Sequence, residues 1–363
     1  LMKLLVTGGC GFIGSNFIRY WLSKYPRDTI INLDALTYAG HPENLKDIEK
    51  NKNYRVATSS AYNFVHGDIT KPKDIKKAIG SGVDGIIHFA AESHVDRSIY
   101  GPLKFIETNV VGTLVLLEAA RENNIQRFLH VSTDEVYGHL PLKSKRKFHQ
   151  KMVYSPRSPY AASKAASDHL VRSYHATYGM DVVITNCSNN LGPFQDPEKF
   201  IPLAITNALD NKPIRVYGNG INVRDWLWVD DHCRGIELAF SKGKKGETYL
   251  FGGKGPEKNN MQIAKTILRK LGKKVVIKRE DQDTNGNATI HLVGDRPGHD
   301  LRYAVDWSKS KKELGWEPEY SLEEMLDKLI EWYAKNRWWW ELLKQRKAGV
   351  VVKHQRVNRG GSS

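Results

Sequence analysis

The chain has 363 residues, 40% of them hydrophobic and 26% charged, a composition that supports one large or two modest globular cores. No apolar run reaches the roughly 18 residues that span a bilayer, and the start lacks a signal-peptide pattern, so we expect a cytoplasmic protein outside the membrane. The net charge of +15 comes without a nucleic-acid-binding motif, which makes nucleic-acid binding the less favoured explanation. The three widely separated cysteines form neither a disulfide framework nor a metal-binding pattern, and no metal site is expected.

The first half of the chain alternates short apolar or β-branched runs with amphipathic stretches of helix length. Strands are predicted over residues 3–7, 29–33, 63–66, 85–90, 127–132 and 181–185. Helices are predicted over residues 12–24, 102–123 and 160–178. This alternation is typical of βαβ units and predicts an α/β fold with a doubly wound, Rossmann-like parallel sheet covered on both faces.

The second half has shorter elements separated by Gly, Pro and Asn. We predict a first domain over residues 1–186 and a smaller C-terminal α/β lobe over residues 187–343, some segments of which return to the sheet. The last clear helix follows Ser321, which forms an S-x-x-E capping box with Glu324. Residues 344–363 are basic and predict a flexible tail.

A glycine-rich turn, TGGCGFIG at residues 7–14, joins the first predicted strand to the first predicted helix. Gly8, Gly11 and Gly14 suit a tight turn, a close backbone approach to a pyrophosphate and close helix–strand packing. Asp34 ends the next strand, where it would accept hydrogen bonds from the adenosine ribose and repel a 2′-phosphate, which favours NAD over NADP. A turn or helix-capping carboxylate is the alternative interpretation of Asp34.

Further candidate cofactor contacts lie beside the glycines and after two later strands. They are Phe12, Ile13, Asp68, Ile69, Phe89, Ala90 and Ala91. Asp68 would contact the adenine, although a lone Asp after a strand equally suits a turn. The small residues after the fourth strand would let the nicotinamide half lie close to the backbone, but small residues also simply end strands.

A tyrosine–lysine pair, Tyr160 and Lys164, lies four residues apart and hence on one helix face. An ammonium near a phenol lowers the pKa of the phenol, so a tyrosinate can act as a base near neutral pH. Tyr20 and Lys24 have the same spacing, but they lie in the helix behind the glycine-rich turn and are expected to point away from a substrate. Thr133 ends a strand on the side where such folds bind ligands, and it can join a network with the Tyr160 phenol.

Two carboxyl groups, Asp134 and Glu135, directly follow Thr133. Consecutive carboxylates on a loop are commonly solvated or cap a helix. Between a hydroxyl and a tyrosine–lysine pair, however, they favour a general acid and a general base. The tyrosine–lysine pair suits hydride chemistry at a sugar carbinol, and the carboxyl pair suits removal of water from that sugar. Together they predict a dehydratase.

These residues lie in motifs through which the chain, from about residue 3 to residue 340, resembles the dTDP-glucose 4,6-dehydratases, a family of the extended short-chain dehydrogenases/reductases. The motifs are TGGCGFIG (7–14), LTYAG (36–40), FAAESHVDRSI (89–99), STDEVYG (132–138), SPYAASKAASDHLVR (158–172), TNCSNNLGP (185–193), PEKFIPL (197–203), VYGNGINVRDW (216–226) and DRPGHDLRY (295–303). In place of the acidic stretch usual in the family, residues 143–151 form a basic loop.

The resemblance implies a role for each catalytic candidate. Tyr160 would take the proton of the sugar 4-hydroxyl, with help from Thr133, while NAD accepts the C4 hydride. Glu135 would remove the C5 proton and Asp134 would protonate the leaving C6 hydroxyl, after which the hydride returns to C6. The product would be dTDP-4-keto-6-deoxyglucose.

The resemblance also implies binding residues and a homodimer formed through helices of the dinucleotide-binding domain. Cofactor contacts would come from Ser93, Thr108, Tyr160, Lys164 and Asn190. Nucleotide-sugar contacts would come from Ser93, Thr133, Asn189, Lys199, Phe200, Ile201, Pro202, Val216, Tyr217, Arg224, Asn260, Asp295, Arg296 and His299. The choice of Asn260 over its neighbour Asn259 is left open by the local pattern.

Two alternatives remain open on sequence. The first is a nucleotide-sugar 4-epimerase or decarboxylase on the same fold, since such relatives keep the hydroxyl, the tyrosine and the lysine but lack the Asp–Glu succession. The second is a non-catalytic nucleotide-binding module. The retained Asp134, Glu135 and Tyr160 disfavour both alternatives, and the nucleobase itself rests on the resemblance alone.

Overall fold

The computed structural model describes residues 1–50, 55–56, 59–295 and 298–346. These residues form two compact units, each assembled from segments that are distant in sequence. The larger unit contains residues 1–194, 221–259 and 298–322, and the smaller unit contains residues 195–220, 260–295 and 323–346. The chain therefore enters the smaller unit three times, and the assignment of residues 187–343 as a nucleotide-sugar lobe stays a prediction.

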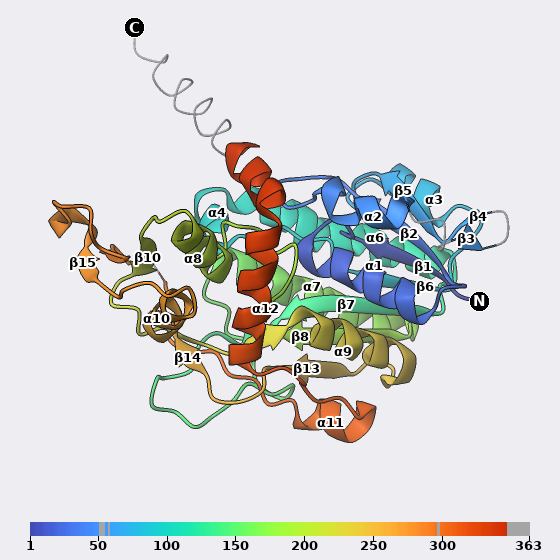
Figure 1. The fold of residues 1–363 in the computed structure, drawn as a ribbon. Coiled ribbons are helices and arrows are strands. Elements are labelled where there is room, and N and C mark those ends of the chain that lie inside the picture. The colour runs from blue at the N-terminus through green and yellow to red at the C-terminus, as the bar shows by residue number, and fades with distance from the viewer. Residues whose placement is uncertain (51–54, 57–58, 296–297, 347–363) are drawn as a thin grey trace, which may run out of the picture. The chain divides into compact units, whose positions relative to one another are not determined.

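A seven-stranded, fully parallel sheet forms the centre of the larger unit (Figure 1). Its order is β13 (Thr248–Phe251), β8 (Val182–Cys187), β7 (Arg127–Thr133), β6 (Gly85–His88), β1 (Lys3–Thr7), β2 (Thr29–Asp34) and β5 (Tyr62–His66). The order reverses between β1 and β6, the place where such sheets bind ligands outside the carboxyl ends of the strands. The predicted doubly wound α/β fold is confirmed.

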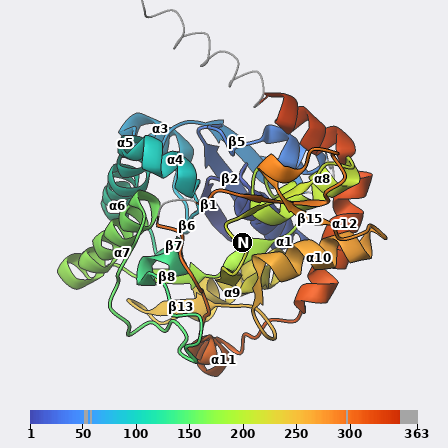
Figure 2. The ribbon, with the colours of Figure 1, turned by 90° about the vertical axis from the view of Figure 1, so that its left-hand side faces the viewer.

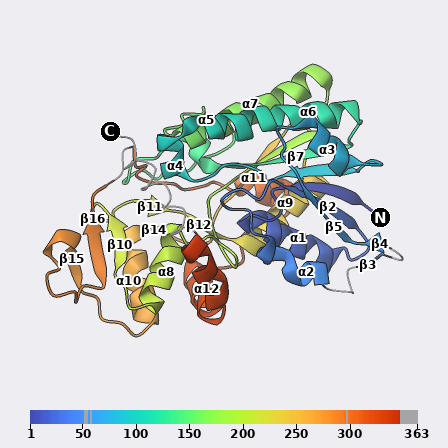
Figure 3. The same cartoon turned by 90° about the horizontal axis from the view of Figure 1, so that it is seen from above.

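Helices cover both faces of this sheet (Figures 2 and 3). One layer contains α1 (Phe12–Lys24) and α9 (Val229–Lys242), and the other contains α3 (Pro72–Ile79), α6 (Gly112–Glu122) and α7 (Pro159–Tyr178). Successive residues of a strand pack into the hydrophobic cores on opposite faces of the sheet. Leu4 packs in the core on the α1 and α9 face, whereas Leu5 packs in the core on the α3, α6 and α7 face. This double burial explains why the strands are continuous apolar runs.

The helix predicted over residues 102–123 is a run of three segments: α5 (Pro102–Phe105), the π-helical η2 (Ile106–Val111) and α6. Asn109 in the π segment exchanges hydrogen bonds with the backbone N–H and C=O of Glu92, at 2.8 and 3.0 Å, and donates to Ser163 Oγ at 2.9 Å. A π turn inside a helix is typical of functional regions. Here it ties the segment after β6 to α7.

Shorter elements connect these layers in the larger unit. They are η1 (Pro42–Leu45), α2 (Lys46–Lys50), β3 (Arg55–Val56), β4 (Ser59–Ser60), α4 (Val95–Tyr100), η3 (Asp134–Tyr137), β9 (Asn189–Leu191), β11 (Val223–Arg224), β12 (Trp226–Trp228), β14 (Lys258–Asn259) and α11 (Ser308–Leu314). Within the described part of the chain, no helix has the length and apolar character needed to cross a membrane.

The smaller unit is also α/β. Its sheet has the order β10 (Ile214–Tyr217), β16 (Ile290–Val293), β15 (Ile277–Arg279), with η4 (Glu280–Gln282) after β15. Its helices are α8 (Phe200–Leu209), α10 (Asn260–Lys270) and α12 (Leu322–Lys335). A further helical stretch over residues 337–346 buries Trp339 and Trp340, so the first residues of the predicted tail are helical, and residues 347–363 lie outside the described residues.

Candidate active site

The glycine-rich turn has the geometry that its spacing predicts. Gly8 has a φ of +72°, and a Cβ there would lie 2.7 Å from the backbone of Ala90 at the end of β6. A Cβ on Gly14 would press against the backbone of Gly8 and Gly9, so glycine lets α1 approach β1 closely. Gly11 caps α1 without a side chain, which leaves the positive end of the helix uncovered.

Asp34 lies at the end of β2 beside this turn. Its carboxylate accepts hydrogen bonds from the backbone N–H groups of Cys10 and Leu36, both at 2.8 Å. Burial raises the pKa of Asp34, and the two N–H groups oppose that rise. A buried acceptor beside an uncovered helix N-terminus fits the ribose and pyrophosphate of a dinucleotide. The carboxylate also accepts from backbone N–H groups of the turn, as the turn-carboxylate interpretation expects. The ribose-binding and turn-stabilising interpretations of Asp34 are therefore compatible.

The other candidate cofactor residues are dispersed around the same edge. Asp68 Oδ1 accepts from the backbone N–H and the hydroxyl of Thr70, at 2.9 and 2.8 Å, so it fastens a turn. Ile69 is buried in the core, and its side chain serves packing. Phe12, Ile13, Phe89, Ala90, Ala91 and Thr108 are partly buried, and Asn190 is buried. Asn190 Oδ1 lies 2.9 Å from His232 Nδ1.

Thr133, Asp134 and Glu135 lie where β7 ends and η3 begins. Thr133 caps η3 by accepting from the Glu135 N–H at 3.2 Å. Asp134 is 2% exposed, and its Oδ2 has no hydrogen-bond partner among the described residues. Burial, together with the charges of Glu135 and Asp225, raises the pKa of Asp134 well above its ordinary value. A protonated Asp134 can therefore donate a proton.

Tyr160 lies in the first turn of α7, which begins behind a Ser158 cap and Pro159. Burial, and then the charges of Glu135, Cys187, Tyr38 and Asp134, raise the pKa of the Tyr160 phenol well above its ordinary value. The 3-10 turn η3, which begins with Asp134 and Glu135, packs against α7, so the phenol and both carboxyl groups come from neighbouring elements. This grouping is the arrangement expected from the sequence.

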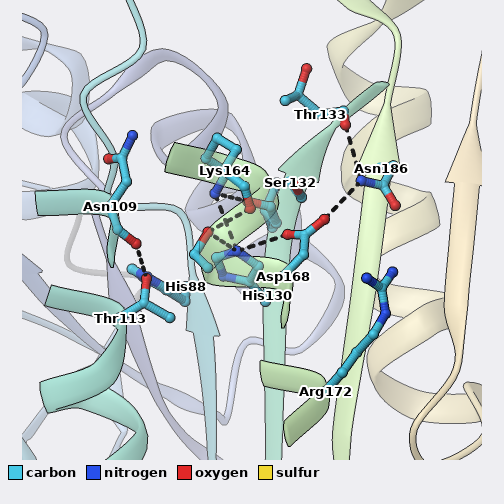
Figure 4. A network of polar contacts seen from close by, with 12 residues as sticks. His88, Asn109, Thr113, His130, Ser132, Thr133, Lys164, Asp168, Arg172 and Asn186 are labelled. Carbon is cyan, nitrogen blue, oxygen red and sulfur yellow. Dashed lines mark hydrogen bonds and ion pairs between the residues drawn. The ribbon is translucent and has the colours of Figure 1, made fainter. Parts of the chain in front are cut away.

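Lys164 was expected to act on the Tyr160 phenol, but its hydrogen-bond partners lie on β7. Its ammonium donates to the Val131 carbonyl at 2.8 Å and lies 3.3 Å from His130 Nε2 (Figure 4). Burial lowers the pKa of Lys164 to about 8. The expected lowering of the pKa of Tyr160 is wrong for this structure, because the buried phenol faces carboxyl groups and the ammonium is directed to the β7 backbone.

Four proposed substrate residues belong to the larger unit in addition to Thr133. Asn189 Oδ1 is buried without a hydrogen-bond partner among the described residues, and Ser93 Oγ lies 3.1 Å from the Tyr38 hydroxyl. Arg224 is buried, and its guanidinium donates to the carbonyls of Val223 and Asp300 at 2.8 and 3.0 Å. His299 is partly buried.

The remaining candidates belong to the smaller unit. Lys199 caps α8, whose first turn holds Phe200, Ile201 and Pro202. The side chains of Ile201 and Val216 are buried, so a ligand could meet only the backbone at these positions. Tyr217 and Asp295 are exposed, and Asn260 is buried at the start of α10. Arg296 lies outside the described residues.

Sequence reasoning missed three buried titratable groups around this site: His130, Asp168 and Asp225. Asp225 acts on Asp134, and burial raises its own pKa to about 6. Asp168 follows Lys164 by one helical turn, so continuing the i, i+4 series from Tyr160 would have found it. Among the described residues, no group of three His, Cys, Asp or Glu side chains is arranged to hold a metal ion.

Residues 5–329 match the family model described as GDP-mannose 4,6 dehydratase. A dTDP-glucose 4,6-dehydratase of Escherichia coli is 47% identical over 357 residues, covering 94% of this chain and 96% of that protein. One of Xanthomonas campestris pv. campestris is 49% identical over 345 residues, covering 92% and 94%. The dTDP-glucose 4,6-dehydratase of Streptomyces venezuelae, crystallised with NAD, is 46% identical with a TM-score of 0.84, covering 94% and 100%.

Proposed function

The chain belongs to the dTDP-glucose 4,6-dehydratase family, and we propose that it removes water from dTDP-glucose to give dTDP-4-keto-6-deoxyglucose. The observation that carries this proposal is the carboxyl pair, buried Asp134 and partly buried Glu135, at the start of η3, which packs against α7 with Tyr160 in its first turn. Oxidation needs only the phenol and a cofactor. Dehydration needs an acid and a base in the same place.

NAD is the cofactor, and when bound it would supply the nicotinamide that accepts the C4 hydride of the sugar and gives a hydride to C6. The glycine turn at Gly8, Gly11 and Gly14 and the Asp34 carboxylate would hold its pyrophosphate and ribose. Two of the three N–H groups of Lys164 point to Val131 and His130, which leaves the third for a ribose hydroxyl. The small side chains of Ala90 and Ala91 after β6 would admit the nicotinamide half.

Tyr160 would accept the proton of the 4-hydroxyl in its phenolate form, with the Thr133 hydroxyl sharing the same network. The raised pKa of the phenol opposes that form, so the positive charges of Lys164 and of a bound nicotinamide would have to stabilise it. Glu135, which is less buried than Asp134, would take the C5 proton that the 4-keto group acidifies. Asp134, kept protonated by burial, would give its proton to the departing C6 hydroxyl, and the C6 oxygen leaves as water. Asp134, whose pKa is raised, would thus perform the step that needs an acid.

A 4-epimerase or decarboxylase activity is not favoured. Such an enzyme needs only the hydroxyl, the tyrosine and the lysine, whereas this chain also buries an Asp with a raised pKa beside Glu135. Burying a carboxyl group without a hydrogen-bond partner at Oδ2 costs free energy of folding, which indicates a chemical use for it.

The test is a direct assay of the purified full-length chain with NAD and a panel of dTDP-, UDP-, CDP- and GDP-hexoses. We expect a 4-keto-6-deoxy product from dTDP-glucose, detected by its ultraviolet absorbance in alkali and by mass spectrometry as loss of one water. A C4 epimer with no loss of water would instead establish the epimerase alternative. Binding without any product would establish the non-catalytic module.

We also propose that the chain forms a homodimer and that it acts in the cytoplasm. Apolar side chains gather on the outer side of the run from α4 to α6, where Tyr100 and Leu103 are 90% and 68% exposed and Ile106 and Leu114 are also exposed. Large apolar side chains exposed along one run of helices suit contact with a second copy of the chain. Replacing Leu103 and Ile106 by Glu should yield a monomer in sedimentation analysis, whereas Val153→Glu, at an exposed apolar site elsewhere, should not.

A further inference from the structure

A row of charged side chains runs along α7 behind the candidate active site. Lys164, Asp168 and Arg172 follow Tyr160 at intervals of four residues and therefore share one stripe of the helix. Lys164 and Asp168 are buried, and Arg172 is partly buried. Charges without a partner are rarely buried, so this stripe requires an explanation beyond packing.

His130 on β7 lies between the lysine and the aspartate. Its Nε2 is 3.3 Å from Lys164 Nζ and 3.3 Å from Asp168 Oδ1 (Figure 4). Burial, and then the Lys164 charge, lower the pKa of His130 to about 4, so the ring is neutral near pH 7. The same nitrogen lies 3.2 Å from Ser167 Oγ. With its proton on Nδ1, the ring accepts from the Lys164 ammonium at Nε2; with its proton on Nε2, it faces the Asp168 carboxylate and the Ser167 hydroxyl. Either tautomer fixes the ring between the two charges.

Asp168 is anchored on its other side as well. Its Oδ2 accepts from the Tyr154 hydroxyl at 2.7 Å, and Asn186 Nδ2 approaches it at 3.4 Å. Asn186 Nδ2 also donates to the Thr133 carbonyl at 3.0 Å, and Arg172 donates to the Tyr154 hydroxyl at 2.7 Å. The carboxylate therefore meets β7 through His130, β8 through Asn186 and the connection that precedes α7 through Tyr154, so several elements fix its position.

We propose that Asp168 and His130 are positioning residues for the Lys164 ammonium on the helical turn after Tyr160: His130 contacts the ammonium, and Asp168 lies on the far side of the same ring nitrogen. Asp168 supplies the compensating negative charge, and His130 supplies the contact that aims the ammonium along β7. The importance of Lys164 for catalysis rests on the proposed function. The positioning itself is a property of the protein without substrate.

The groups facing Lys164 support this assignment. They are Asp168 on α7, His130 on β7, His88 on β6 and Cys187 on β8, and the two histidines and the thiol are neutral near pH 7. Asp168 is thus the anion among them, since the pKa of its carboxyl lies below its ordinary value despite burial, owing to His130, Lys164 and Tyr154. Burial lowers the pKa of Lys164, and the Asp168 charge opposes that effect.

The test measures the pKa of Lys164 directly. The full-length protein is treated with cyanate, which carbamylates only neutral amines, across a pH series, and the Lys164 peptide is quantified by mass spectrometry. We expect a midpoint near pH 8 in the wild type and a midpoint lower by about one pH unit or more in Asp168→Asn, since a nearby opposite charge shifts a pKa by that amount. An unchanged midpoint in Asp168→Asn overturns the proposal.

A matched control is available where α1 meets α9. Glu237→Gln removes the carboxylate that pairs with Lys24 at 2.8 Å, and it should leave the Lys164 midpoint in place. If Asp168→Asn does not fold, the carbamylation midpoint of Lys164 is measured in His130→Leu and His130→Gln instead. His130→Leu should lower the midpoint, and His130→Gln, whose amide oxygen can accept from the ammonium, should restore it. Equal midpoints in the two His130 variants overturn the proposal.

Turnover separates this proposal from the proposed function. In Asp168→Asn the alkaline limb of the kcat/KM profile for dTDP-glucose should move to lower pH together with the labelling midpoint. A wild-type protein that shows the labelling shift on Asp168→Asn but never dehydrates dTDP-glucose contradicts the proposed function and leaves the positioning role intact. Normal turnover with an unshifted midpoint contradicts the positioning role alone.

Discussion

Two tyrosine–lysine pairs with identical spacing lie on α1 and α7 of the larger unit, and their surroundings are opposite. Lys24 is 44% exposed and forms an ion pair with Glu237 of α9 at 2.8 Å. Lys164 is buried and meets a carbonyl and a neutral imidazole. The Tyr20 hydroxyl lies 3.5 Å from Lys24 Nζ, whereas the Tyr160 phenol is influenced by two carboxyl groups.

The comparison shows that spacing alone does not create a reactive pair. Although burial lowers it, the pKa of Lys24 ends above its ordinary value, because Glu237 stabilises the charged form through a hydrogen bond and its charge. The pKa of Lys164 falls to about 8, because burial outweighs the opposing charge of Asp168. The first lysine fastens two helices, and the second keeps a pKa near neutrality.

The strongest test of the comparison exchanges each tyrosine for phenylalanine. Tyr160→Phe should reduce kcat for dTDP-glucose by about a thousandfold, because a positioned acid or base contributes a factor of this order. Tyr20→Phe should leave kcat within about twofold, since its hydroxyl contacts only the structural pair. Comparable losses in the two variants would remove the distinction between the pairs.

The second test separates the phenol from the carboxyl pair beside it. Asp134→Asn combined with Glu135→Gln should reduce product formation by a factor of about a hundred or more while C4 oxidation continues. The retained oxidation is visible as absorbance of the reduced cofactor after dTDP-glucose is added. Solvent deuterium should enter C5 of the sugar in the wild type only. Unchanged turnover in the double variant would refute the acid and base roles.

The third test uses the two lysines. The folded-state pKa of Lys164 is about 8 against an ordinary 10.5, so between these values the folded protein binds fewer protons than the unfolded chain, and stability rises with pH. Urea unfolding should show the wild type gaining up to about 3 kcal/mol over Lys164→Met from pH 8 to 10.5. For Lys24 the folded-state pKa is raised, so the stability that its charge contributes is present below pH 10.5 and is lost only above that pH. The wild type should therefore gain no stability over Lys24→Met between pH 8 and 10.5. If the unfolding free energies of the wild type and of Lys164→Met changed with pH in parallel, the lowered pKa of Lys164 would be contradicted.

The smallest effect concerns the structural pair. Glu237→Gln weakens the contacts of Lys24 and of the Tyr25 hydroxyl, which lies 2.8 Å from Glu237 Oε1, so the free energy of unfolding should fall by about 1 kcal/mol. Turnover of dTDP-glucose should stay at the wild-type rate. A large loss of turnover without a loss of stability would show that α1 and α9 act on the chemistry.

Local patterns determined a large part of this molecule from sequence. The boundaries of β1 and α1 agree with the prediction to the residue, because alternating and helical periodicities and the glycine turn are short-range properties. The helix over residues 102–123 was predicted as one element, and the π segment around Asn109 was missed because a side-chain contact to Glu92 and Ser163 accompanies it. Residues 221–259 and 298–322 return to the larger unit through pairings that no local pattern reveals.

The catalytic candidates show the same division. The sequence by itself identified Tyr160, Lys164, Asp134 and Glu135 through residue type, spacing and resemblance. Only the tertiary structure decided that burial raises the pKa of Asp134, and that Lys164 meets His130, which in turn meets Asp168. The reason is physical: periodicity depends on neighbours along the chain, whereas a pKa depends on burial and on charges that distant segments bring within a few ångströms.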